Sequence, residues 1–403
     1  MLYAFVPGSI PAVSTPFETQ AVALQPDGKI VVAGSGSLGR TAVMRFTASG
    51  AVDTSFGTGG QVHDQMGGRV GNALSAVVQP DGRLLVAGFV EWDGGVSADF
   101  ALVRYDEDGS PDPEFGTKGY VRTDFGGNQD TAFAMALQPD GRIVVAGQCL
   151  VGNQNLAVAR YMPDGTLDPS FGAGGKAWTN LHGGADSARA VALQHDGKIV
   201  LAGTAWQKSS GFDFAVVRYR PDGRLDTSFG TGGSATFDFD GQEDIAHAIA
   251  VQPDGGIVVA GGTLGAEARS NFALVRLDAD GSLDSTFGER GRILTDFEGG
   301  LDLAHALVLQ PAGRIVVAGE TQRKRAPTGF DFSLARYSKD GRLDREFGDG
   351  GKVLTDIEGM GGLDAVAALA LQEDGRLLAV GRTVITKGER SHSHNFALAR
   401  YLP

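Results

Sequence analysis

A four-residue motif, Gln-Pro-Asp-Gly or a close copy of it, occurs seven times along the chain. Its Gln stands at positions 25, 79, 138, 194, 252, 310 and 372, so successive copies begin 54 to 62 residues apart. A period of this length indicates one supersecondary unit copied along the chain, with each copy burying a face against the next. Residues present in every copy are therefore expected to be architectural, and residues present in a few copies are where function is expected.

One copy, residues 130–181, shows the pattern of the unit. Residues 130–138 alternate between two faces, which predicts a strand. Pro-Asp-Gly then predicts a tight turn into a short apolar strand over residues 142–147. Residues 156–161 and 176–181 predict two further strands, joined by a second Pro-Asp-Gly turn and a Gly-rich connection. Four strands joined in this way form an antiparallel meander, and seven such sheets predict an all-β fold, a single seven-bladed β-propeller.

The predicted propeller is one domain over residues 1–403. Its blades are expected at about 18–66, 72–125, 130–181, 186–239, 244–297, 302–357 and 364–403. The last copy has no fourth strand of its own. Residues 9–17 are similar to a fourth strand, and we expect them to complete the last blade and join the two ends of the chain.

The repeat resembles a known family. The pattern A-L-Q-P-D-G-[KR]-I-V-V-A-G, followed by F-A-L-x-R-Y and D-G-x-L-D-x-x-F-G-x-G-G, is similar to the delta-60 repeat of bacterial proteins and distantly similar to NHL-type repeats. The resemblance covers essentially the whole chain. It implies a β-propeller, and it favours a secreted or periplasmic protein, although residues 1–14 show no secretion signal.

Composition restricts the classes of partner. The formal net charge of −13 disfavours nucleic acid and favours cationic partners or metal ions. No run of 18 apolar residues occurs, so membrane insertion is not expected. The single cysteine, Cys149, cannot form an intrachain disulfide and is expected to be a small apolar filler. We expect a monomer.

An Arg near the end of strand three and an Asp eight residues later recur together in the first six copies. The constant spacing predicts a structural ion pair. The pairs are Arg45 and Asp53, Arg104 and Asp112, Arg160 and Asp168, Arg218 and Asp226, Arg276 and Asp284, and Arg336 and Asp344. The Phe of each following Phe-Gly pair is expected to pack between copies.

Five copies open strand one with an Asp. These carboxylates predict a partial ring that could hold a hard cation such as Ca²⁺ or Mg²⁺. The alternative is structural, because Asp side chains also accept hydrogen bonds from loop backbone. The five residues are Asp130, Asp186, Asp244, Asp302 and Asp364.

Three residues after these Asp positions, the copies differ. His247 and His305 are expected on adjacent copies, with Arg189 one copy away, and together they are the predicted catalytic residues. The alternative is that the histidines are hydrogen-bonded core residues.

The loops between strands two and three vary most, and they supply the predicted ligand-binding residues. Exposed Trp beside carboxylates suits a sugar or a cationic ligand, whereas a basic sector suits an anion. The alternative is that the charges are solvated loop tips and the Trp rings pack on neighbouring loops. The predicted residues are Trp92, Trp206, Asp99, Asp213, Asp331, Arg323, Arg325, His392 and His394.

The sequence thus predicts a non-catalytic scaffold that recognises a protein or carbohydrate ligand through its loop-rich face. The alternative function is a hydrolase or lyase, assisted by a divalent ion, with its site at the channel mouth. The propeller fold hosts both kinds of function, so the fold does not decide between them.

Overall fold

The computed structural model describes residues 3–5, 18–92, 97–127, 129–239, 243–265, 269–323, 329–357, 362–386 and 392–403. The chain divides into two compact units. Unit 1 comprises Met1–Val6, Ala192–Arg220 and Leu225–Pro403, and unit 2 comprises Pro7–Val191 and Pro221–Arg224. Among the described residues the only helices are two 3₁₀ turns, η1 (Ser37–Gly39) and η2 (Pro311–Gly313), and no helix there is long and apolar enough to cross a membrane.

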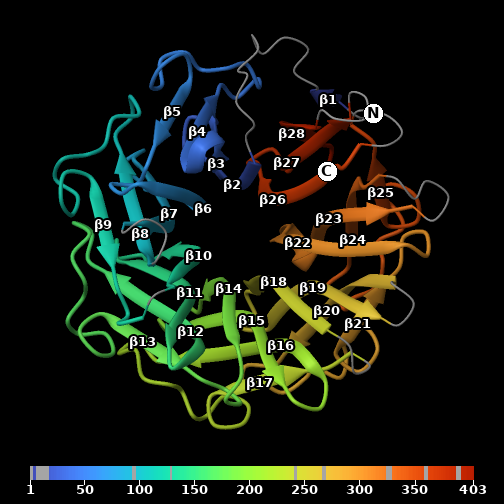
Figure 1. Cartoon of the computed structure of the whole chain (residues 1–403). Coiled ribbons are helices and arrows are strands. Elements are labelled where there is room, and N and C mark those ends of the chain that lie inside the picture. Colours follow the sequence, from blue (N-terminus) through green and yellow to red (C-terminus); the bar gives the residue numbers. More distant parts are fainter. Residues whose placement is uncertain are drawn as a thin grey trace. The chain divides into compact units, whose positions relative to one another are not determined.

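Unit 2 holds the strands of the first three copies (Figure 1). They are β2 (Glu18–Leu24), β3 (Ile30–Gly36), β4 (Arg40–Phe46), β5 (Gln61–Asp64), β6 (Val70–Val78), β7 (Leu84–Glu91), β8 (Ala98–Tyr105), β9 (Tyr120–Thr123), β10 (Thr131–Leu137), β11 (Ile143–Val151), β12 (Asn153–Tyr161) and β13 (Lys176–Thr179). The boundary between the units falls within β14 (Asp186–Leu193).

Unit 1 holds the remaining strands. They are β1 (Tyr3–Phe5), β15 (Ile199–Gln207), β16 (Gly211–Tyr219), β17 (Ser234–Phe237), β18 (Glu243–Val251), β19 (Ile257–Gly265), β20 (Arg269–Leu277), β21 (Arg292–Thr295), β22 (Leu301–Leu309), β23 (Ile315–Gln322), β24 (Asp331–Tyr337), β25 (Lys352–Thr355), β26 (Ala365–Leu371), β27 (Leu377–Thr386) and β28 (His392–Tyr401).

The strands form antiparallel meanders, but the predicted count of seven blades is wrong. Five sheets are separate four-stranded blades: β2–β5, β6–β9, β10–β13, β14–β17, and β1 with β28, β27 and β26. The fifth and sixth copies share one eight-stranded sheet instead. The two copies are joined where Ser270 of β20 pairs in parallel with Leu301 of β22, and the Ser270 Oγ accepts a hydrogen bond from the Asp302 N–H at 2.8 Å.

An N-terminal strand completes the last copy, as predicted, but the strand that the structure shows is another segment. β1 pairs antiparallel with β28, with Tyr3 opposite Arg400 and Phe5 opposite Leu398. The predicted segment, residues 9–17, lies outside the described residues. The structure therefore corrects the closing strand of this sheet to Tyr3–Phe5.

Apolar side chains from consecutive copies form the cores. In unit 2, Leu85 and Ala87 of β7 pack with Ile143 and Val145 of β11 in one cluster, and Phe115 of the intervening Phe-Gly pair is fully buried in it. The second strand of each copy is buried on both faces, which is why its sequence is continuously apolar rather than alternating. Each copy therefore depends on its neighbour for burial, as expected of a repeat protein.

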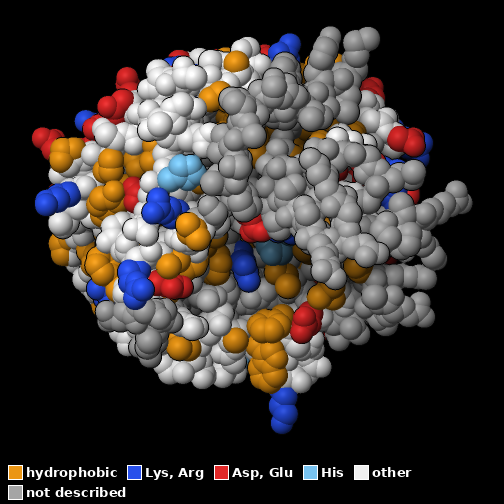
Figure 2. All heavy atoms as spheres, turned by 45° about the horizontal axis from the view of Figure 1, so that its top comes forward, with side chains coloured by type: hydrophobic (Ala, Val, Ile, Leu, Met, Phe, Trp, Pro, Cys, Tyr) orange, Lys and Arg blue, Asp and Glu red, His pale blue; other side chains and the backbone are white. Residues whose placement is uncertain are grey.

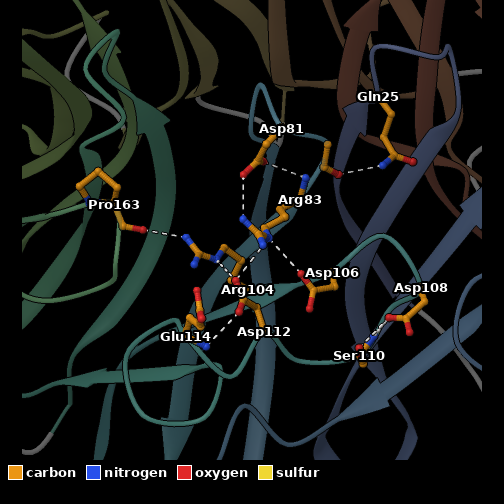
Figure 3. Close-up of polar contacts among 11 residues, drawn as sticks. Gln25, Asp81, Arg83, Arg104, Asp106, Asp108, Ser110, Asp112, Glu114 and Pro163 are labelled. Atoms are coloured by element: carbon orange, nitrogen blue, oxygen red, sulfur yellow. Dashed lines mark hydrogen bonds and ion pairs between the residues drawn. The ribbon is translucent and has the colours of Figure 1, made fainter.

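The predicted Arg–Asp pair is present and also connects one copy to the next. Arg104 Nε lies 2.7 Å from Asp112 Oδ2, and Arg104 Nη1 donates to the Pro163 carbonyl of the following copy at 2.7 Å (Figure 3). Arg45 and Arg160 make the same two contacts within unit 2. Because these guanidinium groups are almost fully buried, the pair fixes the connection between strands three and four.

Candidate functional site

The position that varies between copies on strand one lies in a β-bulge. Wherever the register between strands one and two is described, the ladder skips one residue, and the skipped residues are Gln20, Leu74, Phe133, His247, His305 and Ala367. A bulge redirects a side chain and is common beside active sites. The architecture therefore repeats this position, whereas its side chain changes from copy to copy.

A glycine on strand two makes the bulge sterically feasible. A Cβ on Gly261 would lie 1.9 Å from the Ile245 carbonyl oxygen, and a Cβ on Gly319 would lie 1.8 Å from the Leu303 carbonyl oxygen. Only glycine allows the two backbones to approach this closely. The Ala-Gly pair in the middle of this strand is therefore explained by the bulge opposite.

The two histidines meet in unit 1. His247 of β18 and His305 of β22 are half-buried, and their ring centres lie 5.0 Å apart in an edge-to-face arrangement. The His305 Nε2 atom is 3.6 Å from Glu320 Oε1 on β23. The side chains of His305 and Glu320 are 24% and 17% exposed, so the group is accessible to solvent. Two imidazoles and a carboxylate side by side can transfer protons near neutral pH.

Arg189 belongs to unit 2, so its predicted grouping with the two histidines of unit 1 stays a prediction. Its guanidinium carbon lies 4.6 Å from the ring centre of Phe133. Burial lowers the pKa of Arg189 below its ordinary value. Among the described residues its Nε has no hydrogen-bond partner.

The five Asp side chains that open strand one are fully buried and bind loop backbone. One carboxylate oxygen of each accepts a hydrogen bond from a backbone N–H of the preceding connection, as the structural alternative expects. The donors are Phe125 to Asp130 at 2.7 Å, Leu181 to Asp186 at 2.7 Å, Phe239 to Asp244 at 2.6 Å, Phe297 to Asp302 at 2.9 Å, and Ile357 to Asp364 at 2.8 Å. Burial raises the carboxyl pKa of both Asp302 and Asp364 to about 6. Binding of Ca²⁺ or Mg²⁺ by these residues stays a prediction.

Three of these Asp residues belong to acidic triads. Each triad has one oxygen per residue within 4.8 Å of the others, a spacing that could hold a hard cation. Within the described part of the chain, the triads are Asp99, Asp124 and Asp130; Asp213, Asp238 and Asp244; and Asp331, Asp356 and Asp364. Arg122 pairs with Asp99 and Arg323 pairs with Asp331, so protein cations already contact two of the triads.

The predicted aromatic residues are exposed. Trp92 is 37% exposed and Trp206 is 39% exposed, and apolar side chains lie among charged ones on the surface in Figure 2. The guanidinium carbon of Arg122 lies 5.0 Å from the Trp92 ring centre, and Arg122 is in turn bound to Asp99. Trp92 and its neighbours thus form a supported aromatic platform in unit 2, which we call the Trp92 platform.

Other predicted ligand-binding residues are not described. Arg325 lies outside the described residues, and the side chains of His392 and His394 on β28 are also outside the description. The sequence reasoning in turn missed Trp178, which is 48% exposed, and the contact of Glu320 with His305. Glu320 follows the strand-two glycine, a position that differs in every copy, and that variation was the available signal.

Comparisons with known proteins identify the scaffold. The family described as "Domain of unknown function (DUF5122) beta-propeller" matches residues 25–56, 79–115, 138–171, 194–229, 252–287 and 310–347, together more than half of the chain. No curated protein matches the chain significantly.

Similar solved structures include two lyases. One is a catalytically inactive histidine-to-alanine variant of virginiamycin B lyase from Staphylococcus aureus with quinupristin, at 8% identity, TM-score 0.55, and coverage of 100% of this chain and 99% of that chain. The second is a streptogramin B lyase, at 9% identity, TM-score 0.51, and coverage of 95% and 92%. A periplasmic gluconolactonase from Pseudomonas aeruginosa matches at 15% identity, TM-score 0.45, and coverage of 86% and 87%. At these identities the likeness to the two lyases shows the all-β propeller fold alone.

Proposed function

The chain belongs to the DUF5122 beta-propeller family, and on this scaffold we propose that it is a lyase or hydrolase in which His247 and His305 transfer protons. The observation that carries the proposal is the contact between the two imidazoles, together with the carboxylate of Glu320 beside one of them. The lyases of similar fold support the proposal only in that this fold accommodates such chemistry.

The position of Glu320 assigns different roles to the two histidines. Glu320 Oε1, 3.6 Å from His305 Nε2, holds that imidazole in place, and we assign the proton donor to His305 and the base to His247. In an elimination, His247 removes a proton next to a carbonyl, the electron pair forms a carbon–carbon double bond, and the leaving oxygen takes a proton from His305. In an ester hydrolysis, His247 removes a proton from the attacking water and His305 protonates the leaving alcohol.

The test is a product screen with matched variants. The purified protein is incubated with lactones, aryl esters and a cyclic depsipeptide such as quinupristin, and products are identified by mass spectrometry. For any substrate converted, His247→Gln and His305→Gln should each lower kcat by about 100-fold or more. Glu320→Gln should lower kcat by less, because it removes only the group that orients His305.

The control carries the same chemical change elsewhere. His195→Gln replaces an exposed histidine on a repeat turn and should leave turnover unchanged. Full turnover retained in the double variant of His247 and His305 would refute the catalytic proposal. If none of the lactones, aryl esters or cyclic depsipeptides is converted, the catalytic proposal is rejected for those three substrate classes.

The second candidate is a binding scaffold for a carbohydrate or protein ligand, and the Trp92 platform favours it. An exposed indole held by Arg122, which is itself held by Asp99, presents a pre-organised surface for stacking against a sugar ring. Binding to a glycan array should be lost in Trp92→Ala and retained in Trp178→Ala, which removes an even more exposed indole. An array signal that Trp92→Ala leaves unchanged would remove this platform from the proposal.

A further inference from the structure

We propose that a pocket on the Pro-Asp-Gly side of the fifth copy binds a guanidinium group, such as the arginine side chain of a partner polypeptide. In this pocket the guanidinium of the ligand would occupy the place that a Lys or Arg side chain of the protein occupies in other copies. This site is separate from the histidines and does not depend on the proposed catalytic function.

In five copies, the residue after the Pro-Asp-Gly turn is a cation that reaches the Asp of the repeat ion pair. That Asp therefore has two cationic partners, the second being the repeat Arg. The nitrogen–oxygen distances are 3.5 Å for Lys29 and Asp53, 3.4 Å for Arg83 and Asp112, 3.1 Å for Arg142 and Asp168, 3.9 Å for Lys198 and Asp226, and 3.3 Å for Arg314 and Asp344.

The second copy shows how the carboxylates hold this cation (Figure 3). The guanidinium of Arg83 lies 2.9 Å from Asp106, 3.1 Å from Asp81 and 3.4 Å from Asp112. Asp108 stands two residues beyond Asp106 in the same turn. In the fifth copy the equivalent positions are also Asp, namely Asp254, Asp278, Asp280 and Asp284, whereas the position of Arg83 is occupied by Gly256. The fifth copy thus retains the anionic residues and lacks the cation.

The repeat Arg of the fifth copy, Arg276, lies closer to the position of the absent cation than the repeat Arg of other copies does. Arg276 Nε donates to Gln252 Oε1, Nη2 donates to Asp254 at 2.7 Å, and Nη1 pairs with Asp284. Arg45, Arg104, Arg160 and Arg218 instead stack on the Phe of their own copy and donate to a carbonyl of the next copy. Among the described residues Arg276 makes neither contact. In the fifth copy the guanidinium of Arg276 alone therefore pairs with carboxylates that pair with two cations in the second copy.

An open pocket of about 610 Å³ lies at this place in unit 1, and Lys29 and Arg83 line smaller pockets of about 480 and 450 Å³ at the first and second copies. Arg276 and four carboxylates line the pocket of the fifth copy, those of Asp254, Asp278, Asp280 and Asp284. Hydrogen bonds from the Gly256 N–H and the Ser282 hydroxyl lower the pKa of Asp254 and Asp280, so both stay ionised at neutral pH. Four negative charges facing one positive charge favour a second cation, and the planar guanidinium matches paired carboxylates.

A reciprocal pair of variants tests the proposal. Backbone amide shifts of labelled protein are followed while N-acetyl-arginine methylamide is added, with the isosteric but neutral N-acetyl-citrulline methylamide as the control ligand. Binding of one exposed side chain is expected to be weak, with saturable shifts at the turns around Asp254 and Asp280. Gly256→Arg makes the fifth turn identical to the second and should weaken binding by at least about tenfold. Arg83→Gly should create a second set of shifts around Asp81 and Asp108.

The arginine variant at Gly256 is compatible with the fold. A Cβ there would lie 2.7 Å from Arg276 Nη2, the mobile end of a side chain that can return to the geometry of the other copies. Agmatine distinguishes the source of the ligand: tighter binding of the acetylated arginine indicates a polypeptide, and tighter binding of agmatine indicates a free guanidine. Equal binding of the citrulline compound, or binding that Gly256→Arg leaves unchanged, would overturn the proposal.

Discussion

The buried carboxyl of Asp302 should make the protein less stable as the pH rises from 4 to 7. Asp302 is fully buried, and this burial raises its pKa from the ordinary 3.8 to about 6. In the folded protein the carboxyl therefore holds its proton more tightly than in the unfolded chain. The stability that it contributes is fully present below pH 3.8 and is lost as the pH rises through about 6. One pKa unit corresponds to about 1.4 kcal/mol, so the loss is about 3 kcal/mol.

Asp302→Asn removes this loss and keeps the acceptor for the Phe297 N–H, which lies 2.9 Å away. The free energy of unfolding of the variant minus that of the wild type should therefore increase by about 2 kcal/mol between pH 4 and pH 7, most of the full difference. Urea unfolding at each pH measures the difference, and a ¹³C carboxyl titration of the native protein measures the pKa directly.

Asp164→Asn is the control of opposite sign. A hydrogen bond from the Thr166 hydroxyl lowers the pKa of Asp164, so this carboxyl stabilises the fold when ionised. Replacing it should make the difference curve fall as the pH rises through the range below about 4, and should leave the curve nearly flat between pH 4 and pH 7. A flat curve for Asp302→Asn, or an Asp302 titration midpoint near 4, would refute the reasoning from burial.

Two further predictions concern the repeat itself. Gly319→Ala should lower the free energy of unfolding by more than about 3 kcal/mol, because the new methyl group would lie 1.8 Å from a carbonyl oxygen. The control is Gly350→Ala, where the methyl group enters open space at φ +59. This control should lower the free energy of unfolding by only about 1 kcal/mol in the same urea assay. Arg160→Ala leaves the buried carboxylate of Asp168 without its main partner and should lower the free energy of unfolding by about 3–5 kcal/mol. Arg142 is a partly exposed partner of the same Asp, so Arg142→Ala should lower it by less than about 1 kcal/mol. Equal losses for either pair, measured by urea unfolding, would contradict the geometric argument.

The sequence predicted the elements of each copy well because each rests on a strong local signal. Pro-Asp-Gly determines the turn, and the fixed eight-residue offset of Arg160 and Asp168 places opposite charges at one connection. These signals repeat, so each copy supports the interpretation of the others. The predicted number of blades was wrong for the same reason. A repeated pattern gives no signal for a single bridge, such as Ser270 to Leu301, that joins two copies into one sheet.

The candidate site was predictable only in part. The two histidines were identifiable because they break the pattern at one repeated position, and the bulge explains why that position tolerates any side chain. The contact of Glu320 with His305 depends on the register between β22 and β23, which a bulge shifts by one residue. The terminal strand Tyr3–Phe5 was missed because three residues are too few to show a period.

The fifth copy is the place where both proposals meet on one strand. β18 carries His247 in its bulge, and the turn that follows β18 carries Gly256 in place of a cation. Neither change is required by the fold, because other copies hold the same bulge with Leu74 or Ala367 and the same turn with a Lys or Arg. Stability alone would favour the second cation, since without it Arg276 gives up its contacts with Phe287 and with the next copy. A copy that forgoes these contacts while keeping all four carboxylates is therefore better explained by a ligand than by architecture.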